Sequence, residues 1–332
     1  MALFGGGVPV ILKEGSDAQT HLAALELLRG TLSPEGERQL ESDIRAVKAG
    51  IVGEERILYE LRNSHQEMYV LQDLFLEHGG LTAQIDFLVI TPQRNFVLEC
   101  KNLYGDITIT DRGDFVRSFG GGRREGIYSP ITQNQRHLEL IREMRRSNRS
   151  LAMNLLFDRD FSDVYRSYVV LANPKTVLHD RGADSAARSQ VIRADQLTAV
   201  IKAVNDERGP GREKTFRSAT RDLAEWFLAQ HKDNPVDYVA KSPIFVEIRQ
   251  ICLKQGICYA RICSSRVTWC GKDPAWRSQS SCHFPLPTTG PSTHRRPLTS
   301  QTRMGNRGRL RSYSGQTRAE NRTAVSPCRT SG

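Results

Sequence analysis

The sequence QIDFLVI at residues 84–90, followed by FVLECK at residues 96–101, decides the fold. Both runs are rich in aliphatic and aromatic residues, which predicts two strands, and the intervening TPQRN sequence predicts a turn between them. Charged residues interrupt these apolar runs at Asp86, Glu99 and Lys101. Because side chains alternate along a strand, Glu99 and Lys101 are expected on the same face. A hairpin would bring Asp86 close to them.

These three residue types in this arrangement suit the chemistry of phosphodiester hydrolysis. Carboxylates inside an apolar strand are costly unless they are paired or bind a metal. Two carboxylates can hold Mg²⁺ with several waters left on the ion, and a nearby lysine can orient an attacking water and neutralise charge on a phosphate. The spacing also fits a buried ion pair between Lys101 and one carboxylate, with the other carboxylate at a strand end. Spacing alone leaves both interpretations open.

The surrounding pattern predicts an α/β protein, in which closely spaced strands form a mixed sheet with helices on its faces. Apolar spacing near three to four residues predicts a helix at 17–29, a second at 33–48 after the Ser-Pro start signal, and a third beginning near Gly53. Short β-rich runs predict strands at 68–76, 82–90, 95–100, 106–110, 114–119 and 165–172. Further helices are predicted at 131–146, 195–204 and 214–230.

Five separated blocks in this order resemble the nuclease-related domain, a family of the PD-(D/E)xK nuclease superfamily. The resemblance covers roughly residues 49–145 and extends more loosely to about residue 204. One departure is Cys100, where the family more often has Thr or Val; its side chain is expected to point away from Glu99 and Lys101. The blocks are Gly53-Glu54-Glu55, Gln84-Ile85-Asp86, Glu99-Cys100-Lys101-Asn102-Leu103-Tyr104-Gly105, Asp106-Ile107, and Ser129-Pro130-Ile131-Thr132-Gln133-Asn134-Gln135.

The resemblance implies a restriction-endonuclease-like core and a role for each matching residue. Asp86 and Glu99 would bind the metal, and Lys101 would be the catalytic lysine. Glu55 would be a further acidic metal ligand, in preference to Glu54, although a solvated glutamate in a first helical turn is the alternative. Gln133 would bind phosphate or water, or would be only a polar residue of the first helical turn.

His137, one turn beyond Gln133 on the same predicted helix, is expected to be a surface histidine.

Charge divides the chain into two parts. Residues 1–232 hold 31 Lys and Arg against 32 Asp and Glu, a net charge of −1, whereas residues 233–332 hold 16 against 5, a net charge of +11. The basic character therefore belongs to the tail, and composition gives no basic patch on the body. We expect an extension with two helices at 1–48, a nuclease-related domain at 49–204, a helical segment at 205–232 and a largely disordered tail at 233–332.

Six of the seven cysteines lie after residue 251, and an odd count without a signal sequence argues against a secreted disulfide framework. The cysteine-containing region resembles a damaged zinc ribbon, and the sequence that follows it has the composition of out-of-frame translation. The cysteine gaps of five, four, six and eleven residues contain no C-x2-C pair, so zinc is not expected. The cluster consists of Cys252, Cys258, Cys263, Cys270, Cys282 and His283.

The sequence therefore predicts a nuclease that uses Mg²⁺ or Mn²⁺ to cleave DNA, in repair or processing. We expect a cytoplasmic setting, nucleic acid as the partner and no membrane span. The tail's arginines could bind phosphates without sequence preference. Two other classes remain open: a nucleic-acid-binding module that keeps the fold without turnover, and a regulatory interaction domain.

Overall fold

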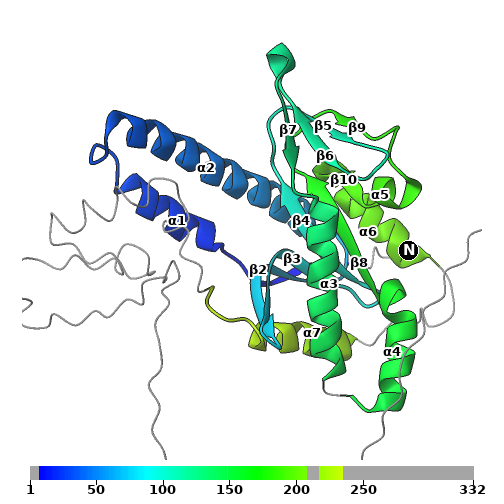
Figure 1. The fold of residues 1–332 in the computed structure, drawn as a ribbon. Helices are drawn as coiled ribbons and strands as arrows, with labels where there is room; N and C mark the ends of the chain where they lie inside the picture. The colour runs from blue at the N-terminus through cyan, green and yellow to red at the C-terminus, as the bar shows by residue number, and fades with distance from the viewer. Residues whose placement is uncertain (1–6, 148, 208–216, 235–332) are drawn as a thin grey trace, which may run out of the picture. The chain divides into compact units, whose positions relative to one another are not determined.

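The computed structural model describes residues 7–147, 149–207 and 217–234. Its centre is a six-stranded sheet in the order β1-β2-β3-β4-β8-β10 (Figure 1). The pairs β2–β3 and β3–β4 are antiparallel, and the pairs β1–β2, β4–β8 and β8–β10 are parallel, so the sheet is mixed, as predicted. The strands are β1 (Val10–Lys13), β2 (Tyr69–His78), β3 (Leu81–Ile90), β4 (Asn95–Lys101), β8 (Tyr165–Leu171) and β10 (Val191–Arg193).

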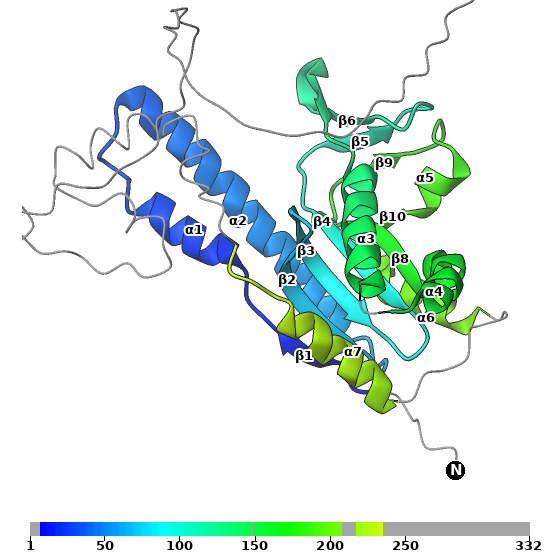
Figure 2. The same cartoon turned by 60° about the horizontal axis from the view of Figure 1, so that its bottom comes forward.

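Helices cover both faces of this sheet (Figure 2). Alternation along β3 and β4 sends Leu88 and Val97 to one apolar cluster, which includes residues of α3 (Pro130–Arg146), α4 (Leu151–Val164) and α7 (Arg217–Ala229). It sends Phe87 and Leu98 to a second cluster with α2 (Pro34–Arg62) and α6 (Leu197–Asp206). Burial of apolar surface on both faces explains why residues 87–90 of β3 and 96–98 of β4 are continuously apolar.

A smaller sheet in the order β7-β6-β5-β9 follows the end of β4. Ile107, Ile109 and Phe115 anchor it to the main sheet through a buried cluster that includes Val169 and Leu171. Its strands are β5 (Asp106–Ile109), β6 (Phe115–Ser118), β7 (Arg124–Ile127) and β9 (Leu178–His179). The short elements nearby are η1 (Gly120–Gly122), α5 (Ser185–Ser189) and η2 (Ala194–Gln196).

The N-terminal helices form a hairpin with its own apolar cluster. Leu25 of α1 (Asp17–Glu26) packs with Leu40 and Ile44 of α2. The predicted break near residue 50 is wrong, because α2 is one continuous helix from Pro34 to Arg62. Glycine inside a helix costs only about 1 kcal/mol, and α2 buries apolar residues against two clusters, which outweighs that cost.

Several further elements differ from the sequence prediction, which gave no element for β7, β9, β10 or α5. Residues 10–13 form strand β1, which pairs in parallel with β2, where an extended arm was expected. Helix α4 was not predicted, and its first half exposes Leu151 and Leu155 (86% and 74% exposed), so it lacks the one-sided apolar pattern from which helices are recognised.

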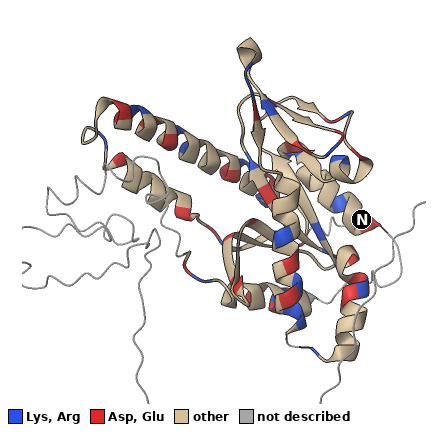
Figure 3. Cartoon of the chain, viewed as in Figure 1, with Lys and Arg blue, Asp and Glu red and all other residues tan. Residues whose placement is uncertain are grey.

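Positively and negatively charged residues are interspersed along α2 and α3, in line with the nearly neutral body (Figure 3). No helix within the described residues is long and apolar enough to cross a membrane. The predictions of a disordered tail, a damaged zinc ribbon and tail arginines that contact phosphates concern residues after 234, which lie outside the described part of the chain.

Candidate nuclease site

Asp86 meets Glu99 and Lys101 where the β3–β4 ladder ends. The two strands pair from Ile90↔Asn95 to Phe87↔Leu98. Beyond that point Asp86 Oδ2 accepts a hydrogen bond from the Cys100 backbone N at 2.7 Å. A side-chain carboxylate therefore replaces the backbone carbonyl as the acceptor where strand pairing stops. Lys101 Nζ forms an ion pair with Glu99 Oε1.

Strands β2 and β3 are both irregular at the level of Asp86. Ile85 and Leu88 are three residues apart, yet both belong to the cluster beneath α3, so the simple alternation of β3 breaks at Asp86. On the neighbouring strand β2, Asp73 has a φ of 52°, in the left-handed region that few residues other than glycine adopt. The pairing register continues on both sides of Asp73 and Asp86. The local bend therefore accompanies the carboxylate and does not shift the strands.

Burial and mutual repulsion set the protonation of the two carboxylates. Burial first, and then the charge of Glu99, raise the pKa of Asp86 well above its ordinary value. Burial also raises the pKa of Glu99, against the opposing charge of Lys101. For Lys101, burial alone would lower the pKa, but the charges of Glu99 and Asp86 outweigh it and raise the pKa. Burial therefore disfavours the charged forms of both carboxylates, and the charge of Lys101 only partly offsets this effect.

One carboxylate oxygen of Glu99 lacks a regular hydrogen bond within the described part of the chain. Glu99 is only 2% exposed, and its Oε2 is buried without a hydrogen-bond partner of ordinary geometry among the described residues. A polar contact from the Gln133 side chain lowers the pKa of Glu99 and places Gln133 beside this carboxylate. A buried carboxylate oxygen without a full set of partners is costly, and a cation can supply the missing interaction.

Helix α3 brings Gln133 to the site. The Ser129 side chain caps the helix by accepting a hydrogen bond from the Thr132 backbone N at 3.4 Å, and Pro130 occupies its first turn. Asn134 Nδ2 donates to the Tyr168 backbone oxygen at 3.1 Å, which ties the same turn to β8. The start of α3 is thereby fixed against the sheet at the level of Glu99.

His137 lies one turn further along α3 and is buried, so the expectation of a surface histidine is wrong. Burial, and then the nearby charge of Lys101, lower its pKa to about 4, and the ring is neutral at pH 7. Its Nδ1 has no hydrogen-bond partner among the described residues. His137 is therefore a buried, neutral residue close to Lys101.

Helix α2 contributes an acidic residue, and it is Glu54 that faces the other carboxylates. Burial raises the pKa of Glu54, Asp73 and Glu99 raise it further, and the charge of Glu54 in turn raises the pKa of Asp86. Gln72 Nε2 donates a hydrogen bond to Glu54 Oε2 at 3.0 Å and holds the side chain in place.

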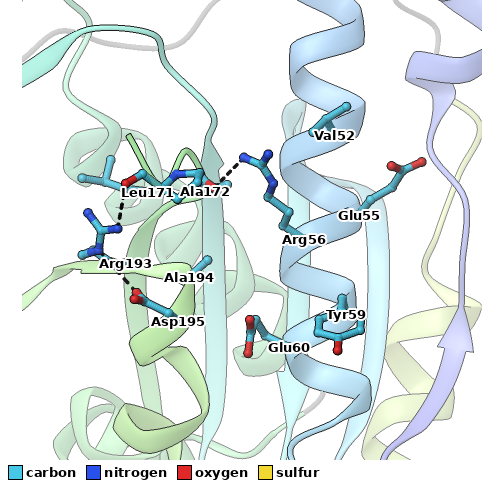
Figure 4. Close-up of a pocket in the computed structure, with 11 residues that line it drawn as sticks. Val52, Glu55, Arg56, Tyr59, Glu60, Leu171, Ala172, Arg193, Ala194 and Asp195 are labelled. Atoms are coloured by element: carbon cyan, nitrogen blue, oxygen red, sulfur yellow. Dashed lines mark hydrogen bonds and ion pairs between the residues drawn. The ribbon is translucent and has the colours of Figure 1, made fainter. Parts of the chain in front are cut away.

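Glu55 lies apart from this group, which differs from the expectation that it joins the metal ligands. It is exposed and lines a pocket of about 390 Å³ between α2 and the segments that follow β8 and β10 (Figure 4). Arg56 in the same pocket donates a hydrogen bond to the Ala172 backbone oxygen at 3.0 Å. A helix turns about 100° per residue, so only one of two successive glutamates can face the sheet.

Gly53 explains how α2 comes so close to β4. A Cβ atom at this position would lie 2.6 Å from the Asn102 Cβ and 2.9 Å from the Cys100 Sγ. Asn102 Nδ2 also donates a hydrogen bond to the Ala49 backbone oxygen at 2.6 Å, which joins the end of β4 to α2. Cys100 packs with the cluster beneath α2, on the face opposite to its neighbours on β4. The missing side chain of Gly53 thus lets Glu54 approach the carboxylates.

The mixed sheet with helices on both faces, and an acidic strand hairpin that ends in Glu-x-Lys, are features of the PD-(D/E)xK-like nuclease superfamily. Residues 49–172 match the family model of the nuclease-related domain, which belongs to that superfamily. This part of the chain is therefore similar to the nuclease-related domain. No match was found among curated proteins, and none among solved structures.

The donor set fits a hard divalent cation held by few protein ligands. Within the described residues, no three His, Cys, Asp or Glu side chains lie close enough together to form a metal site by themselves. Mg²⁺ is typically bound by one or two carboxylates plus waters and substrate phosphates. Asp86 and the unpartnered oxygen of Glu99 meet that requirement, and they offer nothing that favours zinc, which prefers nitrogen and sulfur ligands.

The structure brings together four of the five site residues predicted from the sequence: Asp86, Glu99, Lys101 and Gln133. Sequence reasoning ranked Glu54 below Glu55 and placed His137 at the surface. For Glu54 the available signal was the register of the α2 apolar residues, since the buried Gly53 and Ile57 place it nearer the sheet than Glu55. For His137 the signal was its spacing of four from Gln133, which puts both on one helix face.

Proposed function

We propose that this chain is a metal-dependent nuclease that hydrolyses phosphodiester bonds of DNA. The observation that carries the proposal is the buried Oε2 of Glu99, which has no hydrogen-bond partner of ordinary geometry among the described residues. It lies beside Asp86, and the ammonium group of Lys101 contacts the other oxygen of the same carboxylate. The pKa values of both carboxylates are raised, so a divalent cation at this position would relieve their repulsion. A role in DNA repair or processing is part of the same proposal.

The residues of the chain have distinct roles in this proposal. Asp86 and Glu99 hold Mg²⁺ or Mn²⁺, which when bound polarises the phosphate and acidifies a bound water. Lys101 stays protonated because its pKa is raised, and it neutralises charge that develops on the phosphate. Gln133 positions a water or a phosphate oxygen beside Glu99, and Glu54 binds at the site through a water.

The nuclease-related domain is proposed to extend beyond the matched residues to about residue 204. Strand β10 pairs with β8, and Leu197 and Ile201 of α6 are fully buried in the cluster beneath α2. Removal of this segment would expose that cluster, so it belongs to the same folding unit.

A non-catalytic nucleic-acid-binding domain is the second candidate. The observation that favours it is the ion pair between Lys101 and Glu99, because it satisfies Lys101 and one carboxylate oxygen of Glu99 without any metal. In that case the site would keep its geometry and bind nucleic acid, and the same assay would distinguish the two candidates.

The test is a nuclease assay on single-stranded DNA, double-stranded DNA and RNA, with Mg²⁺, Mn²⁺ or EDTA. Asp86→Ala and Lys101→Ala are expected to lower the rate by about 100-fold or more, and EDTA is expected to abolish cleavage. Absence of cleavage with every substrate and metal, or cleavage that both variants and EDTA leave unchanged, would sink the nuclease proposal. Salt-sensitive binding without cleavage would support the second candidate.

Glu54→Gln and Glu55→Gln form a matched pair in the same assay. Loss of a residue that acts on a metal through water typically lowers activity by about 10- to 100-fold. We expect that loss for Glu54→Gln and no change for Glu55→Gln, because only Glu54 faces Asp86 and Glu99. The reverse result would restore Glu55 as the acidic residue of the site.

A further inference from the structure

Two exposed tyrosines mark the ends of the segment that leaves the site and returns to it. Tyr104 is 70% exposed and Tyr128 is 57% exposed. Tyr104 follows Lys101 by three residues, a length of chain that spans at most about 11 Å. Tyr128 precedes Pro130, where α3 begins on its way to Gln133. The segment between them, residues 104–128, contains β5, β6 and β7 and is called the arm below.

The base of the arm packs against the main sheet through Ile107, Ile109 and Phe115, and its β6–β7 turn extends away from that sheet. In Figure 1 its β6–β7 turn forms the top of the view, beyond the end of β4 and the start of α3. Gly105 lets the arm leave β4 sharply, because its φ is 95° and a Cβ atom there would lie 2.4 Å from the Ser118 backbone oxygen. Strand β7 is the edge of the smaller sheet and pairs only with β6 among the described strands.

Positive charge gathers at the turn of the arm. Residues 115–124 contain Arg117, Arg123 and Arg124 and no acidic residue. The guanidinium groups of Arg117 and Arg123 lie 4.6 and 4.9 Å from the centre of the Phe119 ring, and both also contact Glu125, at 3.2 and 3.3 Å. Arg124 is exposed and forms no ion pair with any described residue.

A second aromatic–arginine pair lies at the opposite end of the arm's strands. The guanidinium of Arg136, on α3, is 5.5 Å from the centre of the Tyr128 ring. Ile127 pairs with Phe115 at this end, whereas Ser118 pairs with Arg124 at the turn. The arm therefore carries two exposed tyrosine rings, Tyr104 and Tyr128, and arginines lie next to the rings of Phe119 and Tyr128.

We propose that the arm binds unpaired DNA next to the scissile phosphate. Bases would stack on Tyr104 and Tyr128, and phosphates would contact Arg123 and Arg124. Exposed aromatic rings favour unpaired strands, because the base faces of a duplex are already stacked on one another, and arginine supplies the phosphate contacts. This inference rests on the proposed nuclease function and adds the strand preference of the substrate.

The test measures binding separately from cleavage. The full chain carrying Lys101→Ala is titrated with fluorescent single-stranded DNA, a duplex of the same length and single-stranded RNA, in EDTA. Adding Tyr104→Ala and Tyr128→Ala is expected to weaken binding of single-stranded DNA by at least about 10-fold and to leave duplex binding nearly unchanged. Tyr104→Phe with Tyr128→Phe is expected to restore it, because the ring faces remain.

A matched control and a salt titration make the test sharper. Tyr59, on α2, is 66% exposed and lies outside the arm, so Tyr59→Ala should leave the affinity unchanged. Arg123→Ala with Arg124→Ala should flatten the plot of log affinity against log salt by about 1.4 for a single strand, about 0.7 for each contact.

The outcomes separate this inference from the proposed function. A loss of affinity for single-stranded DNA alone in the tyrosine variants supports DNA binding by the arm, even if the wild type cuts nothing. Cleavage by the wild type with unchanged binding in the tyrosine variants overturns the arm and leaves the nuclease standing. Four other results would also overturn DNA binding by the arm. They are an equal loss of affinity for duplex, a loss of affinity for RNA alone, the same loss of affinity in Tyr59→Ala, and no DNA binding by the Lys101→Ala protein.

Discussion

Replacing Gly53 by alanine tests the close contact between α2 and β4, on which the position of Glu54 depends. The added Cβ would lie 2.6 Å from the Asn102 Cβ and 2.9 Å from the Cys100 Sγ. Carbon atoms pack best at about 3.5–4.0 Å. The helix or the strand must therefore move by about 1 Å to accept a single methyl group.

Gly50 provides the matched control in the same helix. A Cβ atom at Gly50 would have no other atom within 4 Å, so Gly50→Ala should gain only the helix propensity of alanine, about 1 kcal/mol. Gly53→Ala gains the same propensity but adds an overpacking cost of about 1–3 kcal/mol. The free energy of unfolding is thus expected to be about 1–3 kcal/mol lower for Gly53→Ala than for Gly50→Ala.

Urea denaturation of the two variants and the wild type measures this difference directly. A displacement of about 1 Å at a catalytic group can lower a rate by about 100-fold, so Gly53→Ala should also reduce nuclease activity while Gly50→Ala leaves it intact. Equal stabilisation by the two alanines would refute the reasoning, since it would mean that α2 does not lie this close to β4.

Two further predictions concern the buried titratable groups. Asp86→Asn should raise the melting temperature in EDTA at pH 7, because the raised pKa of Asp86 means that its charged form is disfavoured in the folded protein. The gain in melting temperature should fade as the pH falls through the pKa of Asp86 in the folded protein. An unchanged or lower melting temperature at pH 7 would contradict this prediction. His137→Gln should weaken the loss of stability below pH 6.5, because in the wild type the unfolded chain takes up a proton at about its ordinary pKa of 6.5, whereas the folded protein does so only at about 4. The full effect is about 3 kcal/mol, and it is measured as the difference between the two proteins in denaturation series from pH 7 to pH 4; parallel curves would show that His137 is not buried in neutral form. The comparison of two proteins is needed because Asp86 and Glu99 change stability in the opposite direction over the same range.

Much of the fold could be predicted from the sequence, because local patterns carry the information. The apolar runs around Asp86 and Glu99 predicted two paired strands, and the Ser129-Pro130 start signal predicted α3. Helix α4 could not be recognised, since the apolar residues of its first half are mostly exposed and only its second half packs against the core. The continuity of α2 through Gly50 and Gly53 was also hidden, because the helix is held by packing at both ends and not by local propensity.

The sequence by itself determined that neighbouring strands carry Asp86, Glu99 and Lys101, the core of the candidate site. The spacing of Glu99 and Lys101 puts both on one face of a strand, a consequence of backbone geometry that needs no tertiary information. Which helix residues reach that face was decided only by the tertiary structure. Gly53 sets the distance of closest approach and Glu54 follows it into the site, whereas its neighbour Glu55 turns to a separate pocket. Close packing between elements distant in the sequence makes that choice, because the approach of α2 depends on atoms of β4 that no local pattern in α2 encodes.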